Sequence, residues 1–146
     1  MKITFVVNHA AFFCSHRLNF AEELIKRGVN FSLIIGQGGS SEMELSALET
    51  LKKRNIEYYK VPFSNQFSLN FLREIFFIFK IYYYLIRIRP DYVQLISPKA
   101  ILFGGIASQL AKVKNIIFTI SGLGYFYTGE KNLKSTLLKK IYFFLF

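Results

Sequence analysis

The sequence predicts an α/β fold in which helices cover both faces of a parallel sheet. Short apolar runs of strand type alternate with longer amphipathic stretches of helix type along the 146 residues, and Gly28, Pro62 and Pro90 fall where one pattern gives way to the other. Strands that alternate with helices are joined by right-handed crossovers and therefore run parallel. A parallel sheet needs cover on both faces. The chain has no internal repeat and is expected to form one domain, residues 1–146.

The expected strands are short and mostly apolar. They are residues 2–7 (KITFVV), 30–36 (NFSLIIG), 56–61 (IEYYKV), 91–96 (DYVQLI) and 115–120 (NIIFTI). Five such strands in a doubly wound, Rossmann-like sheet are expected in the order 3-2-1-4-5.

The expected helices are residues 16–28, 43–54, 68–89, 98–112 and 132–146. In the first of them, Leu18, Ala21 and Leu24 recur at helical spacing. Gly28 is a natural stop for this helix, because glycine readily adopts the left-handed conformation that ends many helices. Pro90 ends the long third helix.

The helix expected at 68–89 is apolar enough to raise the question of a membrane span. Arg73, Lys80 and Arg87 interrupt it, and the longest uninterrupted apolar run is only 81–86. A span needs roughly 20 apolar residues, so we reject this interpretation. The three cations are seven residues apart and share one side of the helix. We therefore expect a helix packed on the sheet with a basic outer stripe that contacts anionic lipid.

The composition excludes several functions. The chain has 19 Lys and Arg against 9 Asp and Glu, a net charge of +10, but no nucleic-acid-binding motif accompanies this charge, so we expect no nucleic-acid partner. Cys14 is the only cysteine, which excludes an intrachain disulfide and fits a reducing compartment. The chain contains no DxD, HExxH or CxxC motif, and its two histidines are too few for a zinc site. We expect no metal and no resident cofactor.

Ligands of open parallel sheets bind beyond the carboxyl ends of the strands, where the strand order reverses. The loops expected there are 8–17 (NHAAFFCSHR), 97–100 (SPKA) and 121–129 (SGLGYFYTG). Ser15 and Ser97 are candidate N-caps, and cations follow both. Cations in the first turn of a helix oppose its dipole, by about 0.3–1 kcal/mol each, unless an anion shares the site. The alternative is that these side chains simply extend into solvent.

The third loop contains three glycines interleaved with aromatic residues. Gly122 and Gly124 allow a close approach of the backbone to a ligand, and Tyr125 offers a flat face to a sugar or an isoprenoid chain. The alternative is an ordinary connection packed by aromatic residues. The spacing is not GxGxxG and the loop follows the fifth strand, so a nicotinamide cofactor is not expected.

Three stretches of the sequence resemble a known family. They are SHRLNFAEELIKRGVNFSLI, RPDYVQLISPKAILFGGIASQLAKV and FTISGLGYFYTG. Together they resemble the N-terminal domain of family-4 glycosyltransferases of GT-B architecture, and most closely the bacterial enzymes of lipopolysaccharide O-antigen and capsule synthesis. The resemblance covers almost the whole chain.

The resemblance implies a retaining, metal-independent transferase with two Rossmann-like domains. The N-terminal domain binds the acceptor, often a polyprenyl-diphosphate-linked sugar, and the C-terminal domain binds the nucleotide sugar. The acceptor-binding residues expected here are Asn8, His16, Arg17, Ser97, Lys99, Ser121, Gly122, Gly124 and Tyr125. Ser121 is the candidate catalytic position, although many relatives have histidine there. Many relatives also carry a glycine pair in the first loop, where this chain has AAFFCS.

Three hypotheses of function follow. The chain is the acceptor-binding half of a hexosyl- or N-acetylhexosaminyl-transferase whose donor-binding domain is missing, a stand-alone subunit that recruits a separate donor-binding chain, or a non-enzymatic lipid-phosphate-binding module. In each case the expected location is cytoplasmic, on the inner face of the bacterial cytoplasmic membrane. Since the chain has no recognisable nucleotide-sugar site, we expect it to transfer no sugar alone.

Overall fold

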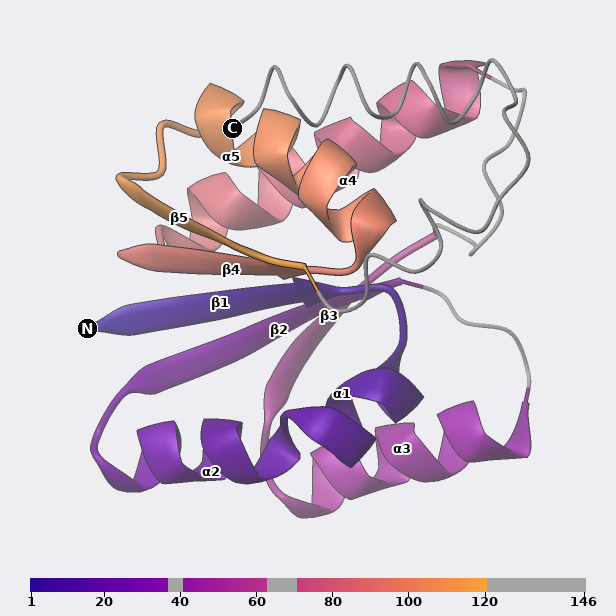
Figure 1. Ribbon diagram of the computed structural model, residues 1–146, viewed down its shortest axis with the longest axis vertical. Coiled ribbons are helices and arrows are strands. Elements are labelled where there is room, and N and C mark those ends of the chain that lie inside the picture. Colours follow the sequence, from indigo (N-terminus) through magenta and orange to yellow (C-terminus); the bar gives the residue numbers. More distant parts are fainter. Residues whose placement is uncertain (37–40, 63–70, 121–146) are drawn as a thin grey trace.

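The computed structural model describes residues 1–36, 41–62 and 71–120 (Figure 1). Its strands form one parallel sheet in the order β3-β2-β1-β4-β5, as predicted. The strands are β1 (Lys2–Val7), β2 (Asn30–Gly36), β3 (Glu57–Val61), β4 (Tyr92–Ile96) and β5 (Asn115–Thr119). The helix expected at 132–146 and the glycine loop at 121–129 lie outside the described residues.

Helices cover both faces of the sheet. On one face lie α1 (Ala10–His16), α2 (Leu18–Lys26) and α3 (Glu42–Lys53), and on the other lie α4 (Phe71–Ile88), a π-helical turn, η1 (Ala100–Gly104), and α5 (Gly105–Leu110) (Figure 1). Side chains alternate between the two faces along each strand, so the sheet separates two apolar cores. Val6, Ile34 and Leu95 belong to the core beneath α4 and α5, whereas Phe5 and Leu33 belong to the core beneath α1–α3.

The prediction of a helix at 16–28 is wrong about where that helix begins. Ser15 was predicted as its N-cap, but the Ser15 hydroxyl donates back to the carbonyl oxygen of Ala11, 3.0 Å away, from inside α1. The chain breaks at Arg17, where φ is −132° and ψ is −8°, and α2 then begins. The predicted stop is confirmed. Gly28 has φ +78°, and the Val29 N–H donates to the Leu24 carbonyl at 3.1 Å, as in a Schellman motif.

The connection from β4 to β5 contains a π-helical turn, and Gly104 at its end lies close to β4. A Cβ atom at Gly104 would lie 2.7 Å from Cδ2 of the buried Leu95. The expected helix at 98–112 is therefore present, but its first part is widened into η1 before α5 continues it. Both glycines of the Gly104–Gly105 pair are buried, which brings this segment close to β4 and β5.

The long helix α4 packs on the sheet as predicted, and none of the described helices is long and apolar enough to cross a bilayer. Phe77, Ile81 and Leu85 form its buried side. The predicted basic outer stripe is only partly correct. Arg87 is exposed, but Lys80 is half-buried, with its ammonium 5.7 Å from the centre of the Tyr84 ring.

Candidate functional site

The carboxyl ends of β1 and β4 meet where the strand order reverses, which is the usual ligand position in such sheets. The pairing of these strands runs from Ile3 opposite Tyr92 to Val6 opposite Leu95. Two further steps along the same register lead to Asn8 on one side and Ser97 on the other. Two of the predicted site residues are thus the first polar residues beyond the two strand ends.

Asn8 and Ser97 share an unusual property. The Oδ1 atom of Asn8 and the Oγ atom of Ser97 are both buried, and neither has a hydrogen-bond partner among the described residues. Leaving a buried polar group unsatisfied costs about 1–3 kcal/mol. Most buried polar groups in folded proteins therefore have partners, and an exception calls for an explanation such as a ligand or a water.

Ser97 also carries backbone strain. Its φ is +89°, in the region that favours glycine. A non-glycine residue held in such a conformation costs about 1–3 kcal/mol, and strain of this kind concentrates at functional sites. The Ser97 carbonyl accepts from the Ile101 N–H at 2.9 Å, so the backbone of Ser97 begins the following helix as predicted. Its side chain does not cap that helix.

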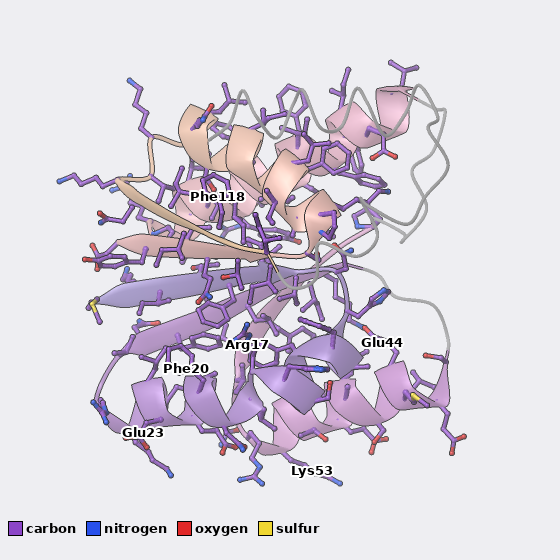
Figure 2. All side chains as sticks on the ribbon, in the orientation of Figure 1. Arg17, Phe20, Glu23, Glu44, Lys53 and Phe118 are labelled. Atoms are coloured by element: carbon purple, nitrogen blue, oxygen red, sulfur yellow. The ribbon has the colours of Figure 1, made fainter. Side chains whose placement is uncertain are left out.

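The junction between β1 and α1 is closed by a carboxylate from α3. The two oxygens of Glu44 accept from the N–H groups of Ala10 and Ala11, both at 2.9 Å (Figure 2). Glu44 is buried, and the first turn of α1 contains no acidic residue of its own. The positive end of the α1 dipole and two of its first N–H groups are thus satisfied by the protein itself.

The junction between β4 and η1 is closed by an ion pair. Lys99 is 2% exposed, and its ammonium lies 3.5 Å from Oε1 of Glu74 on α4. The rings of Phe77 and Phe103 surround the same ammonium, with their centres 5.7 and 5.8 Å away. We predicted that Lys99 would face a bound anion. The structure corrects this, because a buried carboxylate already accounts for the cation at this position.

His16 does not stand at the start of a helix as predicted, because it lies at the end of α1, where a cation is favourable to the dipole. Arg17 follows α1 and is also the N-cap residue of α2, so it does stand at the start of a helix. The seven residues of α1 separate them from the carboxyl end of β1 by about 10 Å. His16 is exposed, and its Nδ1 atom lies 2.6 Å from the Ser15 hydroxyl. Arg17 is on the side of the α1–α2 corner that faces the sheet (Figure 2), and its Nε atom is buried with no partner among the described residues.

The predicted site residues Ser121, Gly122, Gly124 and Tyr125 lie outside the described residues. Their role remains a prediction. Within 1–36, 41–62 and 71–120, no group of three or more His, Cys, Asp or Glu side chains is arranged to hold a metal ion.

Glu44 was missed from the sequence, although a signal for it exists. Ser41 and Glu44 have the spacing of a capping box, and the Ser41 hydroxyl accepts from the Glu44 N–H at 3.4 Å. In that motif the Glu side chain normally turns back to its own helix, whereas here it reaches α1. The same carboxylate affects Cys14: burial, and then the charge of Glu44, raise the pKa of the Cys14 thiol.

The fold is that of a Rossmann-like α/β domain in which the strand order reverses between β1 and β4. A family model described as "Glycosyl transferase 4-like" matches residues 2–146, and the chain belongs to this family. No match was found among curated proteins.

Solved structures with the same fold come from several enzymes. MurG of Acinetobacter baumannii is 15% identical, with a TM-score of 0.60 over 96% of this chain and 39% of its own. The lipopolysaccharide outer core galactosyltransferase WaaB is 18% identical, with a TM-score of 0.58 over 81% of this chain and 32% of its own.

A third structure is a UDP-GlcNAc 2-epimerase from Neisseria meningitidis bound to UDP-GlcNAc. It is 15% identical, with a TM-score of 0.60 over 97% of this chain and 38% of its own. This chain thus spans about two fifths or less of the length of each of the three proteins. At these identities the likeness establishes the fold alone.

Proposed function

We propose that this domain binds the acceptor in a glycosyltransferase reaction, at the crevice beyond the carboxyl ends of β1 and β4. Membership of the glycosyltransferase 4-like family supports the class of reaction. The position rests on one observation: two buried oxygens at the switch point of the sheet, Asn8 Oδ1 and Ser97 Oγ, have no hydrogen-bond partner in the part of the chain that the structure describes.

The chemistry of this pair favours a sugar hydroxyl as the bound group. An amide oxygen can only accept a hydrogen bond, and a fully ionised phosphate cannot donate one, whereas a sugar hydroxyl can donate to Asn8 and accept from Ser97. The buried ion pair of Lys99 with Glu74 removes the lysine from the proposed set of phosphate ligands. We therefore propose that the crevice binds the sugar of a polyprenyl-diphosphate-linked or other glycan acceptor, such as those of lipopolysaccharide or capsule synthesis. Ser121, Gly122, Gly124 and Tyr125 remain candidates from the sequence for binding the diphosphate.

The nucleotide-sugar donor belongs, in this proposal, to a second domain or a separate chain. Transfer needs the two sites together, so the purified 146-residue chain is expected to bind acceptor but to release no nucleotide from any sugar nucleotide. Turnover by this chain alone would contradict the division of roles.

A binding titration tests the acceptor site. The probe is a short-chain polyprenyl-diphosphate-linked N-acetylglucosamine in detergent micelles, compared with UDP-GlcNAc. Asn8→Ala and Ser97→Gly should each weaken acceptor binding about tenfold, since a hydrogen bond of about 1.4 kcal/mol is worth that factor. Ser97→Gly also relieves the positive φ and should leave stability unchanged or higher by about 1 kcal/mol, which separates lost binding from lost folding.

Asn55→Gly is the matched control. Asn55 also has a positive φ, +54°, but it lies in the turn between α3 and β3 at the opposite edge of the sheet. This variant should bind the acceptor as the wild type does. If Ser97→Gly binds equally well, or if UDP-GlcNAc is the ligand whose affinity falls, the acceptor proposal is wrong.

We also propose that the domain works at the inner face of the cytoplasmic membrane, with α4 against the lipid. Leu72, Phe76, Phe79, Tyr83 and Ile86 are exposed and form one line along α4, which we call the α4 stripe. Its spacing of four and three residues keeps the side chains on one side of the helix over about 21 Å. From Ile75 to Ile88 the helix carries Lys80 and Arg87 but no acidic residue, which suits an anionic bilayer.

Vesicle binding tests this location. Phe76 and Phe79 are 53% and 63% exposed, so replacing both with Ser should not disturb the core. The double variant should bind phosphatidylglycerol vesicles at least tenfold more weakly than the wild type, because about 0.8 kcal/mol is lost for each methylene equivalent withdrawn from lipid. Equal binding by the two proteins would contradict the proposed use of α4.

A further inference from the structure

The amino edge of the sheet contains a hollow that the acceptor proposal does not use. It has a volume of about 420 Å³, lies where α4 leads into β4 and α5 leads into β5, and is lined by Leu85, Ile86 and residues 89–91 and 111–115. This size is within the range of small-ligand sites. We call it the amino-edge hollow. The switch-point crevice is at the other end of the strands.

Three cations line the amino-edge hollow. Arg89, Lys112 and Lys114 are exposed, and none has an ion-pair partner among the residues that the structure describes. The only acidic residue in the lining is Asp91, and its carboxylate accepts from the backbone N–H of Lys2 at 2.7 Å. The hollow therefore has a surplus of positive charge.

The helix ends nearby do not account for these cations. Cations are favourable at the carboxyl ends of helices, but the Ile88 carbonyl at the end of α4 already accepts from the Lys2 ammonium at 3.4 Å. The carbonyl of Ser108 near the end of α5 accepts from the Val113 N–H at 3.0 Å. Arg89 and Lys112 have φ values of +51° and +53°, at positions where glycine or asparagine would be less strained.

The amino-edge hollow is continuous with the α4 stripe, because Ile86 belongs to both. A bilayer in contact with the stripe would thus reach the hollow and its three cations, Arg89 after α4 and Lys112 and Lys114 between α5 and β5. From this continuity and the charge, we propose that the amino-edge hollow holds the phosphate of an anionic phospholipid headgroup. This inference rests on the proposed membrane location and adds a headgroup site to it.

The test compares two triple variants of the full chain in vesicle co-sedimentation. The hollow variant is Arg89→Asn, Lys112→Asn and Lys114→Gln, in which Asn is used because it tolerates a positive φ. The control variant is Lys26→Gln, Lys52→Gln and Lys53→Gln. It removes the same charge from α2 and α3, which cover the other face of the sheet. The vesicles are phosphatidylcholine alone or phosphatidylcholine mixed with phosphatidylglycerol.

The hollow variant should bind the mixed vesicles more than tenfold more weakly than the wild type does. The control variant should bind them less than threefold more weakly. On phosphatidylcholine alone the hollow variant should match the wild type. Equal losses by the two triple variants would mean that net charge alone drives binding, and would overturn the headgroup site. So would equal binding by the hollow variant and the wild type.

Two further results separate this inference from the proposed location. If Phe76→Ser/Phe79→Ser loses vesicle binding but the hollow variant does not, the location stands and the headgroup site is wrong. If the wild type binds neither vesicle, both are wrong. A titration with inorganic phosphate provides the last comparison. Binding of inorganic phosphate that the hollow variant loses, with no difference between the two proteins on vesicles, would assign the hollow to a soluble phosphate ester and overturn the lipid assignment.

Discussion

At each of the two strand–helix junctions of the switch point, a carboxylate from another helix compensates a positive or positively polarised group, but that group differs between the two junctions. After β1, the carboxylate of Glu44 bonds directly to two backbone N–H groups of α1. After β4, the carboxylate of Glu74 meets the ammonium of Lys99 between two aromatic rings. In both places a helix of the same layer supplies the acid. In both, a polar side chain two residues earlier in the chain, Asn8 or Ser97, has an oxygen without a partner among the described residues.

The difference between the junctions lies in what happens when one partner is removed. The backbone N–H groups of α1 are neutral, so losing Glu44 leaves unsatisfied dipoles. Losing Lys99 leaves a full charge on Glu74 in a mostly buried position. Since removing the counter-charge of a mostly buried carboxylate costs more than leaving a dipole unsatisfied, the β4 junction should be the more sensitive of the two.

The largest effect is expected for Lys99→Met, which keeps the apolar length of the side chain. It should lower the free energy of unfolding by about 3–5 kcal/mol, the usual cost of breaking a buried ion pair. Chemical denaturation measures this. Lys99→Met combined with Glu74→Gln should recover most of the loss, because no unpaired charge then remains. If Lys99→Met alone is as stable as the wild type, the pair of Lys99 and Glu74 does not contribute this free energy of unfolding.

A smaller effect is expected for Glu44→Ala. The bond from Ala10 is buried, whereas the bond from Ala11 is only partly so, and water can replace the second. The expected loss is therefore about 2 kcal/mol. Glu44→Gln keeps one acceptor oxygen and should lose about 1 kcal/mol. If Glu44→Ala lowers the free energy of unfolding more than Lys99→Met does, the predicted order of sensitivity of the two junctions is wrong.

The smallest expected effect is a change in the reactivity of the Cys14 thiol, beside the junction between β1 and α1. Because burial and the Glu44 charge raise the pKa of Cys14, less thiolate is present at pH 8 than in a free cysteine. Alkylation by iodoacetamide should be slower than that of glutathione and faster in Glu44→Gln than in the wild type. If Glu44→Gln reacts no faster, the carboxylate does not act on the thiol.

The raised pKa of Cys14 also makes the stability of the fold depend on pH in a definite direction. The folded protein holds the thiol proton more tightly than the unfolded chain does. Its contribution is therefore complete below the ordinary pKa of 9.0 and declines as the pH rises above that value. Cys14→Ser should not show this part of the decline. A wild type and a Cys14→Ser variant with the same alkaline profile would contradict it.

The sequence by itself determined the strands, the strand order and most of the helices. Apolar runs such as 2–7 and 30–36 need burial on both faces, and a chain that alternates them with helices has few ways to achieve it. Gly28 also ended its helix as predicted, because a left-handed position favours glycine. Asn8 and Ser97 lie at the switch point as expected, because the first polar residue after a strand lies at its carboxyl end. Their role in binding stays a prediction.

Only the tertiary structure decided how the charged residues are used. Ser15, His16 and Arg17 looked like the start of one helix, but Ser15 and His16 lie in the last turn of α1 and Arg17 joins α1 to α2. Lys99 was predicted to face an anion, and Glu44 was not singled out from the sequence. Their partners come from other helices, 25 residues away for Lys99 and 34 for the bond between Glu44 and Ala10. The local sequence pattern indicates which residues can form a helix. Pairing between distant residues depends on how the helices pack on the sheet, and a short stretch of sequence does not specify that packing.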